Sequence, residues 1–416
     1  MIERTLAIQT VEKIEQKVRL KGWVNARRDH GKIVFIDLRD RSGIVQLVVG
    51  EPISSELEFE KLRPEYVIEV TGTIVSRDEK AVNPQLPTGK VEIKVSEIKT
   101  LSPAESLPFD MGGQELNLEI PTLLDYRSLS LRHPKVQSIF KVQEVIIDSF
   151  REALQDKDFT EFQAPCITPA VAEGGAEVFR VKYFEHEAYL TQSPQLYKSL
   201  LVGDFERVFS VNKIFRAEPS VTTRHLTEVV SLDAEFGFID SWLDVLEMQE
   251  YVVRYIFKQV AQKCSKELAL FSATLPKLSE KIPLVKLRDA QEIIFKRTGR
   301  DVRSEKDLAP EDEREICRWS LDEHGSDLVF VSHFLTKKKP FYVYPDPEDP
   351  TYALSVDLIG RGVEWSSGGQ RLNDYQQILK NANEWGVKAE DIELYLQSFR
   401  YGVPPLGGFA LGAERM

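Results

Sequence analysis

The chain has 416 residues, which is enough for two or three domains with a sizeable core. Asp and Glu outnumber Lys and Arg by 66 to 54, so the formal net charge is −12 and any nucleic-acid-binding surface must be a local patch. Three cysteines without C-x-x-C spacing indicate neither a zinc knuckle nor a disulfide framework, and they fit a reducing cytoplasm. We expect no signal peptide and no membrane-spanning segment, because no apolar run reaches about 18 residues.

Residues 1–103 are predicted to form a small β-domain. Five short segments alternate apolar and polar residues between turn signals: 18–24, 32–39, 43–49, 66–75 and 91–98. Five strands in this length are typical of an OB-type barrel. In the second segment, Phe35 falls on the polar face near Arg27 and Arg28, where an exposed ring could stack on a base. A loop that covers Phe35 is the alternative.

The rest of the chain is predicted to contain a connector and a larger α/β domain. Prolines punctuate residues 104–134, which indicates a hinge with short helical turns. Residues 135–416 follow as the larger domain, and their periodicity predicts several elements. The predicted helices are 136–154, 242–261 and 311–319, and the predicted strands are 160–164, 341–345 and 352–359.

Two apolar runs, 207–214 and 229–238, enclose a polar loop and predict an antiparallel hairpin. Arg216, Arg224 and His225 at the loop could hold a polyphosphate, because Arg makes bidentate contacts with phosphate oxygens. Acidic side chains accompany them: Glu218, Glu228, Asp233 and Glu235. This mixture suits a ligand that carries both phosphates and a cation or amine. A surface hairpin with scattered ion pairs is the alternative.

Other residues are candidates for ligand or metal binding. Gln195 and Lys198 share one face if their turn is helical, and a buried Lys suits a carboxylate, although a surface Lys is the alternative. Asp357 and Glu364 offer oxygen ligands for Mg²⁺, but paired surface carboxylates are common. A glycine-rich segment leads to Arg415, and its glycines allow a close backbone approach to a ligand.

These motifs together resemble the class II aminoacyl-tRNA synthetases, in particular the aspartyl and asparaginyl subgroup. The F-R-A-E sequence, the T-x-R-H loop and L-D-A-E-F resemble motif 2, the helix–strand–Pro unit resembles motif 1, and the glycine-rich end resembles motif 3. The stretch GWVNARRDHGKIVFIDLRDRSGIVQLV resembles the anticodon-binding domain of aspartyl enzymes. The resemblance implies an α+β fold, with an OB-fold barrel and a class II catalytic domain whose antiparallel sheet is flanked by helices.

The same resemblance implies a reaction and its partners. L-Aspartate would be activated with ATP and Mg²⁺ to aspartyl-adenylate and transferred to tRNA-Asp, with tRNA-Asn left open as a second acceptor. The protein would be a cytoplasmic homodimer that uses the motif 1 unit as its interface.

Family roles carry over to matching positions of this sequence. The implied aspartate-binding residues are Glu173, Gln195, Lys198, Asp233, Ser367 and Arg371. The implied ATP-binding residues are Arg216, Glu218, Arg224, His225, Glu364 and Arg415, of which Arg216, Glu364 and Arg415 are catalytic. The implied metal ligands are Asp357 and Glu364, and the implied anticodon contacts are Arg28, Phe35, Gln46, Asn83 and Glu92.

Two residues favour aspartate over asparagine as the substrate. Asparaginyl enzymes lack the Lys found at Lys198, and they typically carry Glu where this chain has Leu372. An asparaginyl enzyme, an asparagine-making paralogue and a catalytically impaired tRNA-binding paralogue remain the alternatives. The chain resembles the compact archaeal form, which lacks a large inserted domain.

The sequence also departs from the family pattern. Leu406 replaces a usual His, and Val229 stands where an adenine-stacking Phe is frequent. Family members continue by roughly another helix after Arg415, so we expect a truncated C-terminus.

Overall fold

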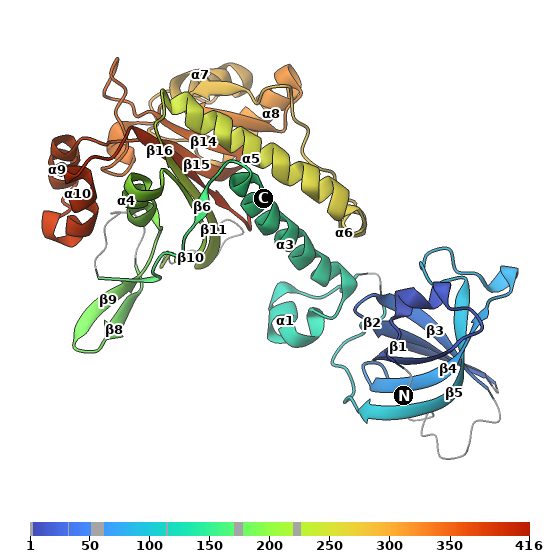
Figure 1. The fold of residues 1–416 in the computed structure, drawn as a ribbon. Helices are drawn as coiled ribbons and strands as arrows, with labels where there is room; N and C mark the ends of the chain where they lie inside the picture. Colours follow the sequence, from blue (N-terminus) through green and yellow to red (C-terminus); the bar gives the residue numbers. More distant parts are fainter. Residues whose placement is uncertain (1–2, 32, 51–61, 114, 170–177, 219–225) are drawn as a thin grey trace. The chain divides into compact units, whose positions relative to one another are not determined.

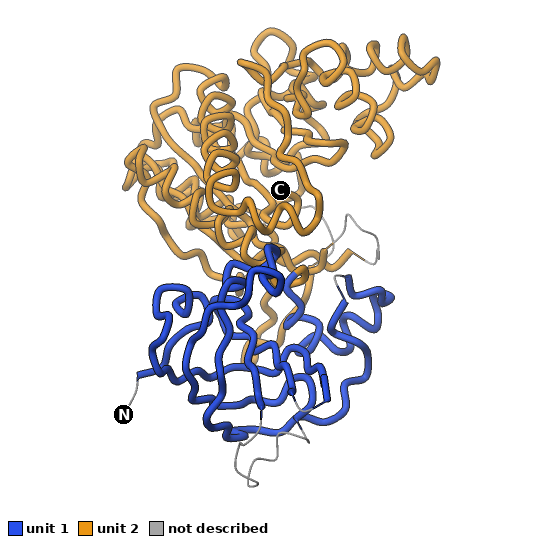
Figure 2. Tube along the Cα trace, turned by 90° about the vertical axis from the view of Figure 1, so that its right-hand side faces the viewer, with its two compact units in different colours: residues 1–134 blue, residues 135–416 orange. Residues whose placement is uncertain are grey.

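The computed structural model describes the chain in six ranges, which are residues 3–31, 33–50, 62–113, 115–169, 178–218 and 226–416. The chain divides into two compact units, residues 1–134 and 135–416 (Figure 2). No helix within the described ranges is long and apolar enough to cross a membrane.

The first unit contains a closed five-stranded barrel with strand order β1-β2-β3-β5-β4. Its strands are β1 (Lys17–His30), β2 (Ile33–Asp40), β3 (Gly43–Val49), β4 (Val67–Ser76) and β5 (Val91–Ser102). In β2 the alternate residues Val34, Ile36 and Leu38 are buried in the barrel core. Strands β3 and β5 pair in parallel and close the barrel, while the other pairs are antiparallel. The predicted OB-type barrel is confirmed.

The segment that follows the barrel belongs to the same compact unit. It contains the short helices α1 (Ile120–Asp125) and α2 (Arg127–Ser130). Arg132 donates to the buried Glu65 at 2.8 Å, and Arg39 of the barrel donates to the same carboxylate at 2.8 Å. One carboxylate therefore ties the segment to the barrel.

The second unit is organised around an eight-stranded sheet of order β12-β13-β14-β15-β16-β11-β10-β6 (Figure 1). Its strands are β6 (Thr160–Glu161), β10 (Arg207–Phe215), β11 (Glu228–Gly237), β12 (Leu284–Lys286), β13 (Leu328–Ser332), β14 (Ser355–Gly360), β15 (Val363–Arg371) and β16 (Leu406–Gly412). The five central pairings are antiparallel, and the two end pairings, β12–β13 and β6–β10, are parallel. A smaller sheet contains β7 (Ile167–Thr168), β9 (His186–Leu190) and β8 (Arg180–Tyr183).

Helices flank the large sheet. They are α3 (Pro134–Gln155), α4 (Gln195–Phe205), α5 (Trp242–Lys263), α6 (Ser265–Leu270), α7 (Leu287–Thr298), α8 (Pro310–His324), α9 (Tyr375–Glu384) and α10 (Glu393–Arg400). Ser241 caps the N-terminus of helix α5, because its hydroxyl accepts from the Leu243 amide at 3.2 Å. The predicted class, α+β with an antiparallel sheet flanked by helices, is confirmed.

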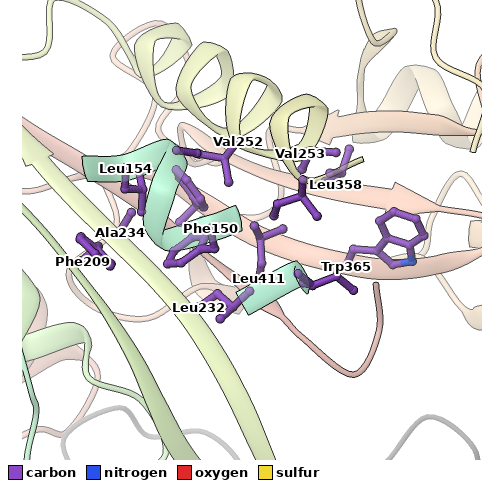
Figure 3. Packing of buried hydrophobic residues seen from close by; sticks show 14 of the residues in the cluster. Phe150, Leu154, Phe209, Leu232, Ala234, Val252, Val253, Leu358, Trp365 and Leu411 are labelled. Atoms are coloured by element: carbon purple, nitrogen blue, oxygen red, sulfur yellow. The ribbon is translucent and has the colours of Figure 1, made fainter. Parts of the chain in front are cut away.

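The main core lies between one face of the sheet and helices α3 and α5 (Figure 3). Phe150 of α3 and Val252 of α5 meet Leu232 of β11 and Leu411 of β16, all with no exposed surface. Because strand side chains alternate between the two faces, the residues next to Leu232 point to the opposite face, where the candidate site lies.

Three predicted strands differ from the structure. The 341–345 segment forms isolated bridges at Val343 and Pro345 instead of a strand, because prolines bracket it and remove backbone donors. Its apolar side chains pack into a separate core with α9 and α10. The strand predicted at 160–164 is limited to β6, which ends before Pro165, and the one predicted at 352–359 begins only at Ser355.

We expect Phe150→Ala to lower the free energy of unfolding of the second unit by about 3–5 kcal/mol, because it removes a fully buried ring from the main core. Urea denaturation followed by tryptophan fluorescence measures this, since four of the five tryptophans lie after residue 134. Glu144→Ala, at an exposed position of the same helix, is the control. Equal midpoints for the two variants would contradict the assigned core.

Candidate active site

The β10–β11 hairpin places two carboxylates on the face of the sheet opposite the main core. Asp233 and Glu235 pair with Ser210 and Val208 of β10, and both acidic residues have no exposed surface. Their neighbours Leu232 and Ala234 point into the main core. The alternation of β11 therefore fixes where the acidic groups point.

Two buried cations compensate these carboxylates. Lys198 of α4 places its Nζ 3.0 Å from Asp233 Oδ1 and 3.4 Å from Glu235 Oε2, and it donates to the Phe409 carbonyl at 3.2 Å. Arg371 of β15 donates through Nε to Glu235 Oε1 at 2.9 Å. Although burial alone would lower the pKa of Arg371, the charge of Glu235 raises it. We call these four residues the charged cluster.

Neighbouring residues complete the hydrogen bonds of the charged cluster. Gln195 lies one helical turn before Lys198, and its amide donates to Glu235 at 3.1 Å. Gly408 of β16 leaves room for the Glu235 carboxylate, because a Cβ at this position would lie 2.1 Å from Oε2. Any side chain at Gly408 would displace the acid.

The charged cluster lies beside a cavity of about 360 Å³ whose walls include Lys198, Arg216, Asp233, Ser367 and Arg371. We call it the first cavity. A second cavity, of about 160 Å³, is lined among others by Glu364, Arg415 and Val229. Arg216, Glu218 and Ser367 line both cavities. The two spaces therefore meet along these shared residues.

The predicted metal ligands lie on the paired strands β14 and β15. Asp357 accepts from the Ser367 hydroxyl at 2.5 Å and from Lys339 Nζ at 2.9 and 3.2 Å. Loss of solvation inside the protein and the negative charge of Asp357 raise the pKa of Glu364 to about 7, although its side chain is still 40% exposed. Arg415 Nη1 donates to the Glu364 carbonyl at 2.8 Å and lies 3.9 Å from its carboxylate.

These two carboxylates fit a divalent cation. They are close enough to influence one another, and the Lys339 ammonium already occupies a cation position at Asp357. Among the described residues, no group of three or more His, Cys, Asp or Glu could hold a metal. Mg²⁺ commonly keeps several waters and uses one or two carboxylates together with substrate phosphates, so a two-carboxylate site is adequate for it.

The barrel brings together four of the five predicted anticodon residues. Arg28 forms two hydrogen bonds with Asp37, at 2.8 and 2.9 Å, and approaches Gln46 at 3.5 Å. Gln46 donates to Glu92 at 3.1 Å, and Phe35 lies two residues before Asp37 on the same face of β2. The remaining predicted residue, Asn83, lies in the turn before β5, where its side chain accepts from the Gln85 amide.

Three predicted site residues lie outside the described ranges: Glu173, Arg224 and His225. Two others, Lys339 and Asp37, contribute to the candidate sites without having been named from sequence, and Glu235 was named only among the acidic side chains of the hairpin. Strand alternation with Asp233 was the available signal for Glu235. No local pattern marks Lys339, which meets Asp357 only in the folded chain.

The comparisons agree on one family. Residues 119–416 match the family described as tRNA synthetases class II (D, K and N), and residues 18–101 match the OB-fold nucleic acid binding domain. The chain belongs to the class II tRNA synthetases of this D, K and N group.

The proteins most like this chain in the comparisons include aspartate–tRNA ligases and an asparaginyl-tRNA synthetase. The chain is 39% identical to the aspartate–tRNA(Asp/Asn) ligase of Deinococcus radiodurans, over 100% of this chain and 93% of that protein. It is also 39% identical to the ligase of the same name from Thermus thermophilus, over 97% and 92%. The crystal structure of Pyrococcus horikoshii asparaginyl-tRNA synthetase complexed with asparaginyl-adenylate superposes with a TM-score of 0.91 at 33% identity, covering 100% of this chain and 94% of that one.

We expect Lys198→Met to lower the free energy of unfolding by about 3–5 kcal/mol, because it leaves two buried carboxylates without their ammonium partner. Adding Asp233→Asn should recover part of the loss, because it neutralises the carboxylate left without a cation, whereas Glu235 keeps its ion pair with Arg371. Urea denaturation of the single and double variants measures both effects.

Lys213→Met is the matched control. Lys213 pairs with Glu228 on the β10–β11 hairpin, and both side chains are about half exposed, so this ion pair should contribute about 1 kcal/mol at most. A cost for Lys198→Met no larger than that for Lys213→Met would contradict the charged cluster.

Proposed function

We propose that the chain is an aspartate–tRNA ligase, which activates L-aspartate with ATP to aspartyl-adenylate and transfers the aspartyl group to tRNA-Asp. The observation that carries the proposal is the pair of buried cations, Lys198 and Arg371, in the wall of the first cavity. Family membership supports the reaction class, and the names of the bacterial relatives support aspartate.

The first cavity suits the amino acid. Lys198 and Arg371 would hold the side-chain carboxylate of aspartate, and Asp233, together with Glu173, would hold its ammonium group. Glu235 acts as a positioning residue, since it holds the Arg371 guanidinium at 2.9 Å. Asparagine would place a neutral amide where aspartate offers a carboxylate, so it would forgo the charge-assisted hydrogen bonds that the carboxylate makes with these cations.

The second cavity suits the nucleotide. Arg216 and Glu218 line both cavities and would contact ATP where its α-phosphate approaches aspartate, with Arg415 at the far end. Arg224 and His225 would complete the phosphate contacts. Asp357 and Glu364 would hold Mg²⁺, which supplies positive charge to the polyphosphate.

The chemistry has two steps. A carboxylate oxygen of aspartate attacks the α-phosphorus of ATP, the bond to the β-phosphate oxygen breaks, and pyrophosphate leaves. A ribose hydroxyl at the 3′ end of the tRNA then attacks the aspartyl carbonyl and releases AMP. Arg216 neutralises charge at the α-phosphate. No covalent enzyme intermediate forms, so the rate depends on positioning and electrostatic stabilisation.

The barrel would read the anticodon. Phe35 would stack on a base, and Gln46 would read its edge, while Arg28, Asn83 and Glu92 would contact neighbouring bases. The two hydrogen bonds that Arg28 donates to Asp37 hold its guanidinium in one orientation before tRNA binds. The Asp/Asn designation of both bacterial relatives supports tRNA-Asn as a second acceptor.

The proposal extends to assembly and location. The family resemblance of α3 and β6 to motif 1 supports a homodimer formed through these elements. The exposed side chains of Ile139 and Phe140 on α3 suit such a contact. Three cysteines without a disulfide framework support a cytoplasmic location.

An asparaginyl enzyme is the second candidate, favoured by the superposition on the Pyrococcus structure. ATP–pyrophosphate exchange with aspartate and asparagine in parallel distinguishes the two. We expect exchange with aspartate, and about 100-fold less with asparagine, because a neutral amide cannot replace the charge-assisted hydrogen bonds of the carboxylate with Lys198 and Arg371. Reactions without amino acid are the control. Comparable exchange with asparagine would reject the aspartate assignment.

We expect Phe35→Ala to weaken tRNA-Asp binding by about tenfold or more, since base stacking on an aromatic ring contributes about 1–3 kcal/mol. Amino-acid activation should stay unchanged. Filter binding measures the tRNA affinity, and ATP–pyrophosphate exchange measures activation. Ile33→Ala, on the same face of β2, is the matched control. Loss of tRNA binding and activation together would contradict separate roles for the two units.

A further inference from the structure

Lys339 has no role in the reaction as described so far, although its ammonium group reaches the predicted metal site. Its Nζ lies 2.9 Å from Oδ2 and 3.2 Å from Oδ1 of Asp357. The side chains of this pair are only 16% and 10% exposed. An ion pair with this burial is screened much less than a surface pair.

The surrounding structure fixes the position of Lys339. Its backbone carbonyl accepts from Trp385 Nε1 at 2.9 Å, and its amide donates to the Thr336 carbonyl at 3.1 Å. Its ammonium lies 4.1 Å from the centre of the Phe334 ring. The preceding residue, Lys338, is exposed. Lys339 is therefore directed inward from a segment whose other lysines face solvent.

Lys339 also lines the first cavity, together with Arg216 and Ser367. Ser367 donates to the same Asp357 carboxylate that binds Lys339. Both Asp357 oxygens are thus within hydrogen-bonding distance of the ammonium, and one also accepts from the hydroxyl. A divalent cation that binds this carboxylate directly competes with these donors for its lone pairs and is repelled by the Lys339 ammonium.

We propose that Lys339 is a built-in cation that competes with the divalent metal for Asp357 and turns toward the nucleotide phosphates when the metal binds. This inference rests on the proposed function, which assigns ATP and its metal to this place. Repulsion between a divalent ion and the ammonium drives Lys339 away from the carboxylate, and the polyphosphate offers it a new partner. Metal and nucleotide would therefore strengthen the binding of each other through one side chain.

Manganese binding to the nucleotide-free protein tests the competition directly. Free Mn²⁺ is measured by electron paramagnetic resonance while wild type, Lys339→Met and Lys339→Gln are titrated. We expect both variants to bind Mn²⁺ about tenfold more tightly, because removal of the ammonium frees a charge-assisted hydrogen bond at Asp357. Lys339→Arg keeps the charge and should resemble wild type. Unfolding temperatures confirm that each variant is folded.

Two comparisons localise the effect. Lys338→Met removes an exposed lysine from the adjacent position and should leave the affinity unchanged. In an Asp357→Asn background, Lys339→Met should no longer tighten binding, because its partner is gone. Equal affinities of wild type and both neutral variants, or the absence of saturable binding in all of them, would overturn the proposal. A gain that persists in the Asp357→Asn background would also overturn it.

The same protein separates this inference from the ligase assignment. ATP–pyrophosphate exchange with aspartate tests the reaction, whereas the Mn²⁺ titration contains neither ATP nor amino acid. Exchange without a Lys339-dependent Mn²⁺ shift would retain the ligase and reject the competition. A shift without exchange would retain the competition at Asp357 and reject the aspartate reaction.

Discussion

The pairing of Lys198 and Arg371 with Asp233 and Glu235 constrains the whole second unit. The four charges come from helix α4 and strands β11 and β15, and they are almost completely removed from water. A buried charge that loses its partner costs several kcal/mol, so these three elements must keep one alignment. A substrate carboxylate arriving at this cluster therefore meets cations whose positions are already determined.

The sheet can support this polar cluster because its opposite face is apolar. Leu232 and Ala234 pack against α3 and α5, while Asp233 and Glu235, one residue along the strand, point the other way. Burying these carboxylates against the apolar core would cost free energy. The alternation of β11 avoids this cost, because it directs them to the face where cations and hydrogen-bond donors lie. Gly408 completes the arrangement, because its missing side chain leaves space for Glu235. Core stability and ligand geometry therefore depend on the same strand register.

The barrel and the hairpin were predictable from sequence because most of their strands alternate apolar and polar residues and turn signals or a polar loop separate them. The 341–345 segment was not, since a short apolar run flanked by prolines has the same composition in a strand and in a buried loop. Lys198 was recognisable from its spacing to Gln195 and from family resemblance. Its contact with Asp233 spans 35 residues, and the contact of Arg371 with Glu235 spans 136, so only the fold reveals them.

The two cavities meet along Arg216, Glu218 and Ser367, and this junction explains how positioning alone could suffice for the proposed reaction. Ser367 reaches into both spaces and donates to Asp357, which in turn binds Lys339. One short chain of hydrogen bonds would thus position the amino acid, the nucleotide and the metal relative to one another. Without a nucleophilic side chain in the mechanism, catalysis depends on holding the attacking oxygen against the α-phosphorus. Because Arg216, Glu218 and Ser367 line both cavities, a shift of one ligand would also move residues that contact the other ligand, and this couples the positions of the two reactants.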